Sequence, residues 1–433
     1  MQKTVLTRAV AVALATLGTG AAFAQSSVTL YGNLDVALDN VHKGSSDYSA
    51  PVVTAANKVT ASSTVTRVSP SLSSVNAFGV KGVEDVGGGY KGNFVLEGQM
   101  SPDTGAQSGQ DSRMWGRQAY VGLTTPGGEI RLGRQYAPMF YSYAFTTVEA
   151  LGGADMQGLG LAANNLQVRQ DNQVSYWLKA GDITAVASYS PQAGVDQKIS
   201  ATRAPSSTSA TGQIIGGASA GTEASGQGSR GQTYGLLVSM AVTPELSANV
   251  AYHQNRFGNA QLGVYNTTVS TFIPLYNLDN AKALSVAAKY SDAASGLVVS
   301  GNLYQTRVAM DTMPTLKLSV LGLGVKQTID QFAVGAQFGY AKFTGGSNGS
   351  DTTLMLIGDY NFSKRSKLYV RAGWMKDKAG NLGATENAGA TVTGGPIPLL
   401  VGLGSTETPF AAGGGVNVGA TSRVVAVGMR HQF

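Results

Sequence analysis

The sequence predicts an all-β protein, a 16-stranded antiparallel transmembrane β-barrel, on the basis of three observations. The first is a low charge content: only 13% of the 433 residues are Asp, Glu, Lys or Arg, about half the usual share in a soluble protein. The second is a period-2 alternation of apolar and polar residues along most of the chain. The third is a regular exchange of short turns and long loops between the strand segments.

The first 24 residues are predicted to be a signal peptide, which leaves residues 25–433 as the barrel domain. Lys3 and Arg8 form a basic start, an uncharged stretch follows, and residues 22–24 have the A-x-A pattern of a cleavage site. The apolar part is too short to span a membrane as a helix. The sequence therefore predicts an exported protein.

Charge and cysteine content exclude several classes of function. Removing Lys3 and Arg8 from the 31 basic residues leaves 29 against 25 acidic ones, a net charge of about +4 without a basic run. This distribution argues against a nucleic-acid partner. Without Cys there is no disulfide scaffold and no thiolate site. The three histidines, His42, His253 and His431, have no metal-ligand spacing, and no G-x-S-x-G pattern stands at a strand-to-helix elbow. We therefore expect no catalytic residue, no metal and no cofactor.

Four segments show the alternation most clearly. In residues 331–343, Phe332, Val334 and Phe338 share one face, while small or polar residues fill the other. Residues 28–38, 246–255 and 281–291 repeat the pattern. A soluble β-sandwich would also alternate, but these segments run about 10–13 residues, which suits a tilted transmembrane strand better. Aromatic residues at strand ends fit a membrane interface: Tyr189, Tyr252, Tyr290, Tyr340, Tyr360 and Phe433.

The connections predict the number of strands. Seven short turns, the first near residues 87–89 and the last near 363–365, alternate with eight longer segments. Fifteen connections join sixteen strands, an even number with both termini on the side of the short turns. Lipid tolerates no open sheet edge, so the sheet must close on itself. The longer segments are 40–71, 101–112, 136–168, 193–230, 258–280, 310–316, 344–351 and 378–420.

Five motifs occur in an order and spacing that point to a known family. They are residues 27–32 (SVTLYG), 78–85 (FGVKGVED), 116–123 (GRQAYVGL), 131–136 (RLGRQY) and the terminal 428–433 (GMRHQF). With them the mature chain resembles the trimeric general porins of Gram-negative outer membranes, especially those of β-proteobacteria. The resemblance implies a cell outer-membrane protein, a homotrimer with contacts through strands 1–5 and 16, and neighbours that are outer-membrane lipid and lipopolysaccharide. It also implies a passive channel for ions and small hydrophilic solutes.

The resemblance further implies an inward-folded third loop and a charged pore constriction. Arg117 and Arg169 stand at the positions of wall arginines, and Glu149 and Asp155 are the matching acidic residues of the third loop. Facing charges of this kind bias which ions pass. The terminal Phe433 corresponds to the signal that the barrel-insertion machinery reads, although an aromatic residue there also serves as a plain interfacial anchor.

Two departures from the family pattern thin the expected cationic wall. Ala77 and Asn33 stand where basic residues are usual. Arg371 shares a face with Lys367 and Tyr369, so alternation places it in the lumen as a further constriction residue. The basic residues that could compensate for the two departures are Arg67, Lys81 and Arg371.

One alternative function stays open at this point. The barrel could act as an adhesin or ligand-binding scaffold through its long loops, of which 193–230 is rich in Ser, Ala, Gly and Thr and 378–420 is rich in Gly. Loop deletion would separate the two functions, since a diffusion channel would keep its conductance. The net charge of about +4 and two wall arginines favour anions weakly, and the residues at 33 and 77 weaken that preference.

Overall fold

The computed structural model describes residues 27–45, 62–70, 72–108, 113–148, 168–191, 198–200, 214–215, 231–256, 261–266, 271–311, 315–345, 349–378 and 421–433. The first half of these residues forms β1 (Ser27–Lys43), β2 (Ser63–Pro70), β3 (Ala77–Gly87), β4 (Tyr90–Ser101), β5 (Ala106–Ser108), β6 (Gln118–Thr125), β7 (Gly128–Tyr136), α2 (Pro138–Thr146), β8 (Arg169–Ala180), β9 (Ile183–Ser190), β10 (Lys198–Ser200) and β11 (Ile214–Ile215). The second half forms β12 (Thr233–Ala241), β13 (Leu246–Arg256), β14 (Gln261–Asn266), β15 (Thr271–Asp292), β16 (Leu297–Met310), β17 (Leu316–Ile329), β18 (Phe332–Thr344), β19 (Gly349–Asn361), β20 (Ser366–Lys378) and β21 (Thr421–Gln432).

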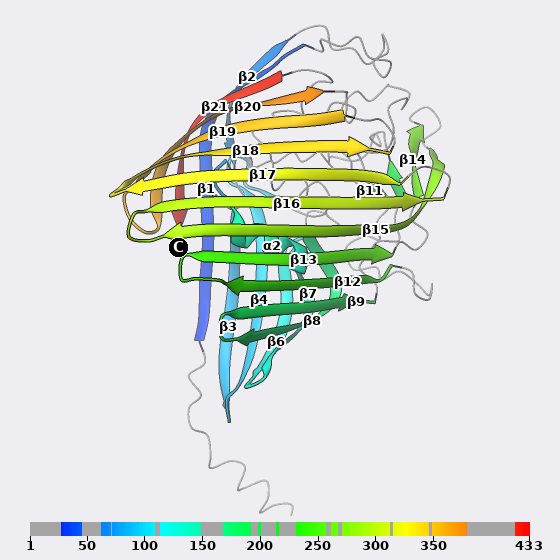
Figure 1. Cartoon of the computed structure of the whole chain (residues 1–433), viewed down its shortest axis with the longest axis vertical. Coiled ribbons are helices and arrows are strands. Elements are labelled where there is room, and N and C mark those ends of the chain that lie inside the picture. The colour runs from blue at the N-terminus through cyan, green and yellow to red at the C-terminus, as the bar shows by residue number, and fades with distance from the viewer. Residues whose placement is uncertain are drawn as a thin grey trace, which may run out of the picture.

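The strands close into an antiparallel barrel, as Figure 1 shows. Successive strands pair with each other, and the last strand, β21, pairs with β1 over residues 33–43 to close the ring. β2 pairs with residues 36–43 of β1, and β3 pairs with residues 27–33 of the same strand. β2 and β3 therefore count together as one strand of the wall. β5, β10, β11 and β14 belong to the loop regions. The wall therefore has sixteen strands, and the predicted fold class is confirmed.

Burial alternates along the strands and separates a lipid face from an inner face. On β21, Val425 and Val427 are 57% and 55% exposed, whereas Val424 and Ala426 are each 1% exposed. The exposed side chains around the barrel are mainly Val, Leu, Ile and aromatic residues, which lipid solvates favourably. At the turn end, Phe332 packs on Tyr360, which packs on Phe362. These rings fit the interfacial aromatic residues that the sequence predicts.

The structure places strand in several segments that the sequence predicts as loop. β2 lies within 40–71, β5 within 101–112, β10 and β11 within 193–230, and β14 and the first part of β15 within 258–280. Neighbouring strands supply backbone hydrogen-bond partners there: β2 pairs with β1, and β10 pairs with β11 and β14. β15 pairs with β16 as far as Leu278, with a register shift near that end. Outside the lipid-facing band, a strand does not need an apolar face. The alternation of apolar and polar residues is therefore weaker in these extensions, and the sequence does not predict them as strand.

The described part of the third long connection lies inside the barrel, as the resemblance implies. Its described part holds α2, which Figure 1 shows behind β13 and β15 inside the ring of strands. Pro138 stands at the start of the helix, a favoured position for proline. The Ser142 hydroxyl lies 2.6 Å from Asn249 Oδ1 and 2.8 Å from Ser285 Oγ, which fixes the helix to the inner faces of β13 and β15. Among the described residues, no helix is both long and apolar enough to cross a membrane.

The C-terminal residue is seated on a glycine at the turn end of the barrel. Gly32 and Phe433 exchange two backbone hydrogen bonds of 3.1 Å. A Cβ atom added to Gly32 would lie 2.3 Å from the Phe433 ring and 2.9 Å from the Ala77 carbonyl oxygen. Only glycine lets the terminal ring approach β1 this closely.

Replacing Gly32 with Val is expected to displace the Phe433 ring and destabilise the folded barrel by about 1–3 kcal/mol, the usual cost of overpacking. Unfolding in urea, followed by the gel mobility of folded and unfolded protein in detergent, measures this change. Gly92→Val is the matched control, because a Cβ at Gly92 meets nothing within 4 Å. Equal unfolding midpoints for the two variants would contradict the expectation.

Candidate pore-lining site

Arg117 lies inside the barrel immediately before β6 and is 7% exposed. Its Nε donates to Glu97 Oε1 over 2.5 Å, and its Nη1 donates to Gln99 Oε1 over 3.4 Å. Glu97 and Gln99 are both buried on β4, two residues apart, so their side chains face inward on the same face. Tyr31 of β1 donates its hydroxyl to the other oxygen of Glu97 over 2.8 Å. One carboxylate thus receives a guanidinium and a phenol.

Arg169, the second predicted wall arginine, lies close to Arg117 at the ring of Tyr136. Arg169 opens β8 and is in register with Tyr136 at the end of β7. Its Cζ lies 4.8 Å from the centroid of the Tyr136 ring, and the Arg117 Cζ lies 5.7 Å from it. Arg169 Nη2 also donates to the Tyr136 hydroxyl over 3.3 Å. The structure therefore gathers Arg117 and Arg169 around a single ring, which we call the Tyr136 cluster together with Glu97.

Aromatic residues of α2 cover this part of the wall. Phe140 stacks on Tyr136 with ring centroids 4.0 Å apart. Tyr141 packs edge-on against Trp177 of β8 at 4.8 Å, and burial raises the pKa of its hydroxyl, which stays protonated. The Arg131 Cζ lies 4.2 Å from the Trp177 ring. The wall on β6, β7 and β8 therefore alternates guanidinium groups with aromatic rings.

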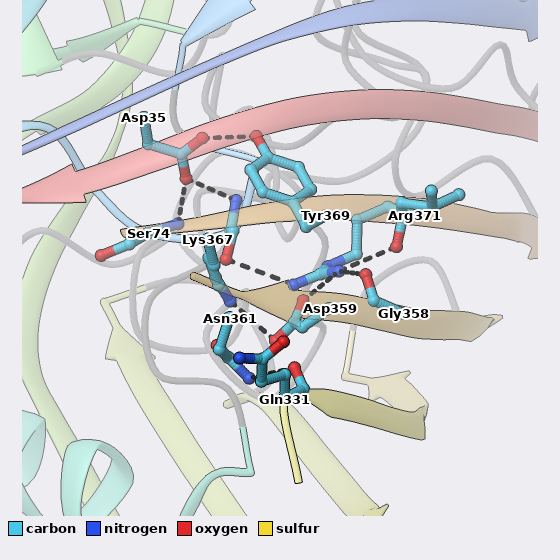
Figure 2. A network of polar contacts seen from close by, with 11 residues as sticks. Asp35, Ser74, Gln331, Gly358, Asp359, Asn361, Lys367, Tyr369 and Arg371 are labelled. Carbon is cyan, nitrogen blue, oxygen red and sulfur yellow. Dashed lines mark hydrogen bonds and ion pairs between the residues drawn. The ribbon is translucent and has the colours of Figure 1, made fainter. Parts of the chain in front are cut away.

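Arg371 lies elsewhere on the wall, on β20, and is only 1% exposed. Figure 2 shows it in a network with Asp359 of β19. Arg371 Nη1 lies 2.9 Å from Asp359 Oδ1, and Lys367 Nζ lies 2.9 Å from Asp359 Oδ2. Arg371 Nη2 donates to Ser73 Oγ over 3.2 Å. Arg371 faces inward, but its charge is enclosed by these partners.

A buried carboxylate on β1 completes the network. Asp35 is 0% exposed and accepts hydrogen bonds from the backbone N–H groups of Ser73 and Ser74, at 2.7 and 2.5 Å, and from the Tyr369 hydroxyl. The Asn76 side chain bonds both backbone groups of Asp35. Residues 72–76, which connect β2 and β3, are thereby bound to the inner wall next to β20, as Figure 2 shows for Asp35, Ser74 and Tyr369. We call residues 72–76 the inner segment.

The structure describes some of the remaining predicted positions and leaves others outside its described residues. Glu149 and Asp155 lie outside the described residues, so their position opposite the arginines stays a prediction. Arg67 pairs with Asp39 at 3.4 Å, and Lys81 lies 5.2 Å from the Tyr31 ring. At the two departures, Ala77 is buried, and Asn33 uses its side-chain amide to bond the Val75 carbonyl over 3.0 Å.

The sequence analysis missed the partners of the arginines. Glu97 and Asp359, which pair with arginines, and Asp35, which accepts a hydrogen bond from Tyr369, are acidic residues on the polar face of an alternating strand, and that parity was a usable signal. The register shifts between Gly133 and Gln135, so alternation does not predict which face Arg134 occupies. It joins Arg113 in contacting Asp171, near the loop end of the wall.

The closed barrel, the inward helix and the arginine-lined wall define a class of protein, and comparison with known proteins identifies the family. Residues 9–380 match the sequence profile of the Gram-negative porins, and the chain belongs to this family. Outer membrane porin protein 32 of Delftia acidovorans is 28% identical to it over 98% of this chain and 99% of that protein. An outer membrane porin protein of Bordetella pertussis is 33% identical over 41% of this chain and 44% of that protein.

Solved structures share the fold. The anion-selective porin from Comamonas acidovorans matches with a TM-score of 0.64 and 22% identity, over 94% of this chain and 100% of that one. A trimer form of OmpT from Vibrio cholerae matches with a TM-score of 0.58 and 14% identity, over 94% and 99%. The protein is thus a multi-pass outer-membrane porin, a passive channel, and the comparisons lend no support to the adhesin alternative.

Proposed function

We propose that the channel favours small anions and that the Tyr136 cluster sets this preference. The observation that carries the proposal is that two guanidinium groups, those of Arg117 and Arg169, meet at the Tyr136 ring, where Glu97 accepts a hydrogen bond from Arg117. At physiological salt a charge is screened over about 8 Å, so charges at a narrow point dominate selectivity. The similar porin from Comamonas acidovorans is described as anion-selective.

The other predicted constriction residues have different parts in this proposal. Glu149 and Asp155, on the third loop, would supply carboxylates that face the arginines and orient dipolar solutes across the pore. Arg371 would act as a wall charge of small effect, because Asp359 lies 2.9 Å from it and solvent barely reaches it. The solutes are small hydrophilic molecules and ions that cross without energy coupling.

The assembly and export of the protein are also proposed. A homotrimer would form through β1 to β7 and β21, which correspond to barrel strands 1–5 and 16; a trimer form is described for OmpT of Vibrio cholerae. Residues 1–24 would be removed as a signal peptide. Phe433 would be read by the insertion machinery, and its exposed position on the outside of the barrel end leaves it accessible.

The reversal potential of the wild-type channel tests the anion proposal. In a planar bilayer with a tenfold KCl gradient, we expect the sign that corresponds to chloride permeating faster than potassium, and conductance steps in groups of three. A potential near zero or of the opposite sign would overturn anion preference and leave the channel function intact. Single, ungrouped steps from folded protein would contradict the trimer.

A further inference from the structure

Two lysines face the inside of the barrel on β15 and β17, away from the arginines of β6 to β8. On β15, Lys289 shares a face with Ser285 and Ala287, which are both buried, so its side chain points inward. On β17, Lys326 shares the inner face with the buried Gly324. Both lysines are half-buried. Figure 1 shows β15, β16 and β17 side by side in front of α2, so the two lysines belong to one part of the wall.

The strand register places Ser300 of β16 between the two lysines. Ser300 is the direct partner of Lys289 on one side and of Gly324 on the other. Lys326 is the next inward-facing residue after Gly324, and its charge repels that of Lys289. Adjacent strands lie about 4.8 Å apart, so the three side chains start from one small area of the inner wall. We call Lys289, Ser300 and Lys326 the Lys289 site.

The Ser300 hydroxyl is buried, and its Oγ has no hydrogen-bond partner among the described residues. A Cβ atom added to Gly324 would lie 2.8 Å from Ser300 Oγ and 2.8 Å from Val148 Cγ2. The hydroxyl therefore leans over the β17 backbone, beside an apolar side chain of the third connection. A buried hydroxyl without a partner is unfavourable. A group that accepts its hydrogen bond would remove this cost.

The described carboxylates do not balance the charge of Lys289. β16, β17 and β18 contain no Asp or Glu, and residues 280–291 of β15 contain none either. No ion pair joins Lys289 to another described residue. Arg117 and Arg371, which also face inward, each lie beside a carboxylate. Because two nearby cations repel each other, an anion between Lys289 and Lys326 would be held favourably.

The Lys289 site lies closer to the short turns than the predicted wall arginines do. Lys289 precedes the turn between β15 and β16 by a few residues, and Lys326 precedes the turn between β17 and β18. Arg117 and Arg169 instead lie at the ends of β6 and β8 that follow long loops. Short turns face the periplasm. An anion that enters from outside the cell therefore passes the Tyr136 cluster first and the Lys289 site second.

We propose that the Lys289 site is a second anion-binding site of the pore, which takes a small monovalent anion such as chloride. The two ammonium groups supply the charge, and the Ser300 hydroxyl donates a hydrogen bond to the anion. The inference rests on the anion preference proposed above and adds a second contact on a different part of the wall. Ions cross a channel fast when several sites each bind them weakly, and two separate basic sites provide such steps.

Single-channel conductance at increasing KCl concentration tests the site. A binding site makes the conductance level off at high salt, and we expect this saturation in the wild type. Lys289→Gln is expected to lower the conductance at low salt about twofold, the effect of one unit charge on an ion about 8 Å away in water. The difference should vanish near 1 M, where charges are screened within about 3 Å. Lys282→Gln is the matched control, because Lys282 lies on the same strand and is exposed on the outward face.

Ser300→Ala separates a bound anion from the general field of the lysines. This substitution keeps both charges and removes a hydroxyl without a described partner, so the barrel is expected to unfold at the wild-type urea concentration. If the anion accepts a hydrogen bond from Ser300, the KCl concentration that gives half-maximal conductance is expected to rise at least about twofold, the fold-change that one net hydrogen bond gives.

Three results would overturn the proposal. They are a wild-type conductance proportional to KCl throughout, equal low-salt conductance of Lys289→Gln and Lys282→Gln, and an unchanged half-saturating concentration in Ser300→Ala. Each of them leaves the wild-type reversal potential on the anion side, so a failure of this site differs visibly from a failure of the proposed anion preference. A wild-type potential of the cation sign would overturn the anion preference and this inference together.

Discussion

Replacing Asp35 with Ala is expected to release the inner segment and destabilise the barrel by about 3 kcal/mol or more. Three donors point at this carboxylate: the backbone N–H groups of Ser73 and Ser74 and the Tyr369 hydroxyl. Each buried donor left without an acceptor costs about 1–3 kcal/mol. No apolar group would replace these contacts, so the losses add up instead of cancelling.

Unfolding in urea measures the loss, and single-channel recording measures its effect on the pore. Because the inner segment is bound to the inside of the wall, its release is expected to add current noise or change the unit conductance. Asp103→Ala is the control, since Asp103 is exposed in the loop after β4 and the charge change is the same. If Asp35→Ala and Asp103→Ala unfold at the same urea concentration, the network does not hold the segment.

The fold could be predicted from the sequence because the membrane imposes a strict pattern. A strand with lipid on one side must alternate between apolar and inward-facing residues. Burial on β21 follows this rule closely: Val425 and Val427 are exposed, whereas Val424 and Ala426 are buried. The even strand count followed from the turns. The prediction was wrong for β2 and the first part of β15, where strands lie beyond the lipid-facing band. Strand formation there depends on backbone hydrogen bonds to neighbouring strands, which the local sequence does not reveal.

The site could be predicted only in part, for a related reason. Alternation predicts that Arg371 faces inward, and the structure confirms it. Alternation within one strand does not predict which residues of other segments contact that side chain. Asp359 comes from the neighbouring strand and Ser73 from a segment 298 residues away in the chain. Such contacts depend on register and on the break between β2 and β3. Alternation therefore predicts which way the Arg371 side chain points, but not the partners that enclose it.

These contacts show where the few charged residues of the chain lie. Charges that the pore does not use are excluded from the lipid band, where one near the midplane costs about 2–4 kcal/mol. Inside the barrel, many of the described charges form groups in which carboxylates lie beside basic side chains, among them the Tyr136 cluster and the network of Asp35 and Asp359.

The Arg117→Ser/Arg169→Ser double substitution is expected to shift permeability toward cations by roughly fivefold. Removing both arginines leaves Glu97 and changes the local charge of the described cluster from positive to negative. In water, one unit charge acts on an ion about 8 Å away with about 0.5 kcal/mol, so two charges change the free-energy difference between anion and cation by at least about 1 kcal/mol. The reversal potential in a KCl gradient at low ionic strength measures the shift.

A triple variant separates the charge effect from a structural one. Arg117→Ser/Arg169→Ser/Glu97→Gln removes the remaining carboxylate, so its selectivity is expected to fall between those of the wild type and the double variant. A collapsed or widened pore would change the conductance of both variants alike and would not restore selectivity. Arg67→Ser, which removes an arginine paired with Asp39, is expected to leave the reversal potential close to that of the wild type. If the double variant keeps the wild-type potential, Arg117 and Arg169 do not lie at the constriction, and selectivity must be set by the third loop.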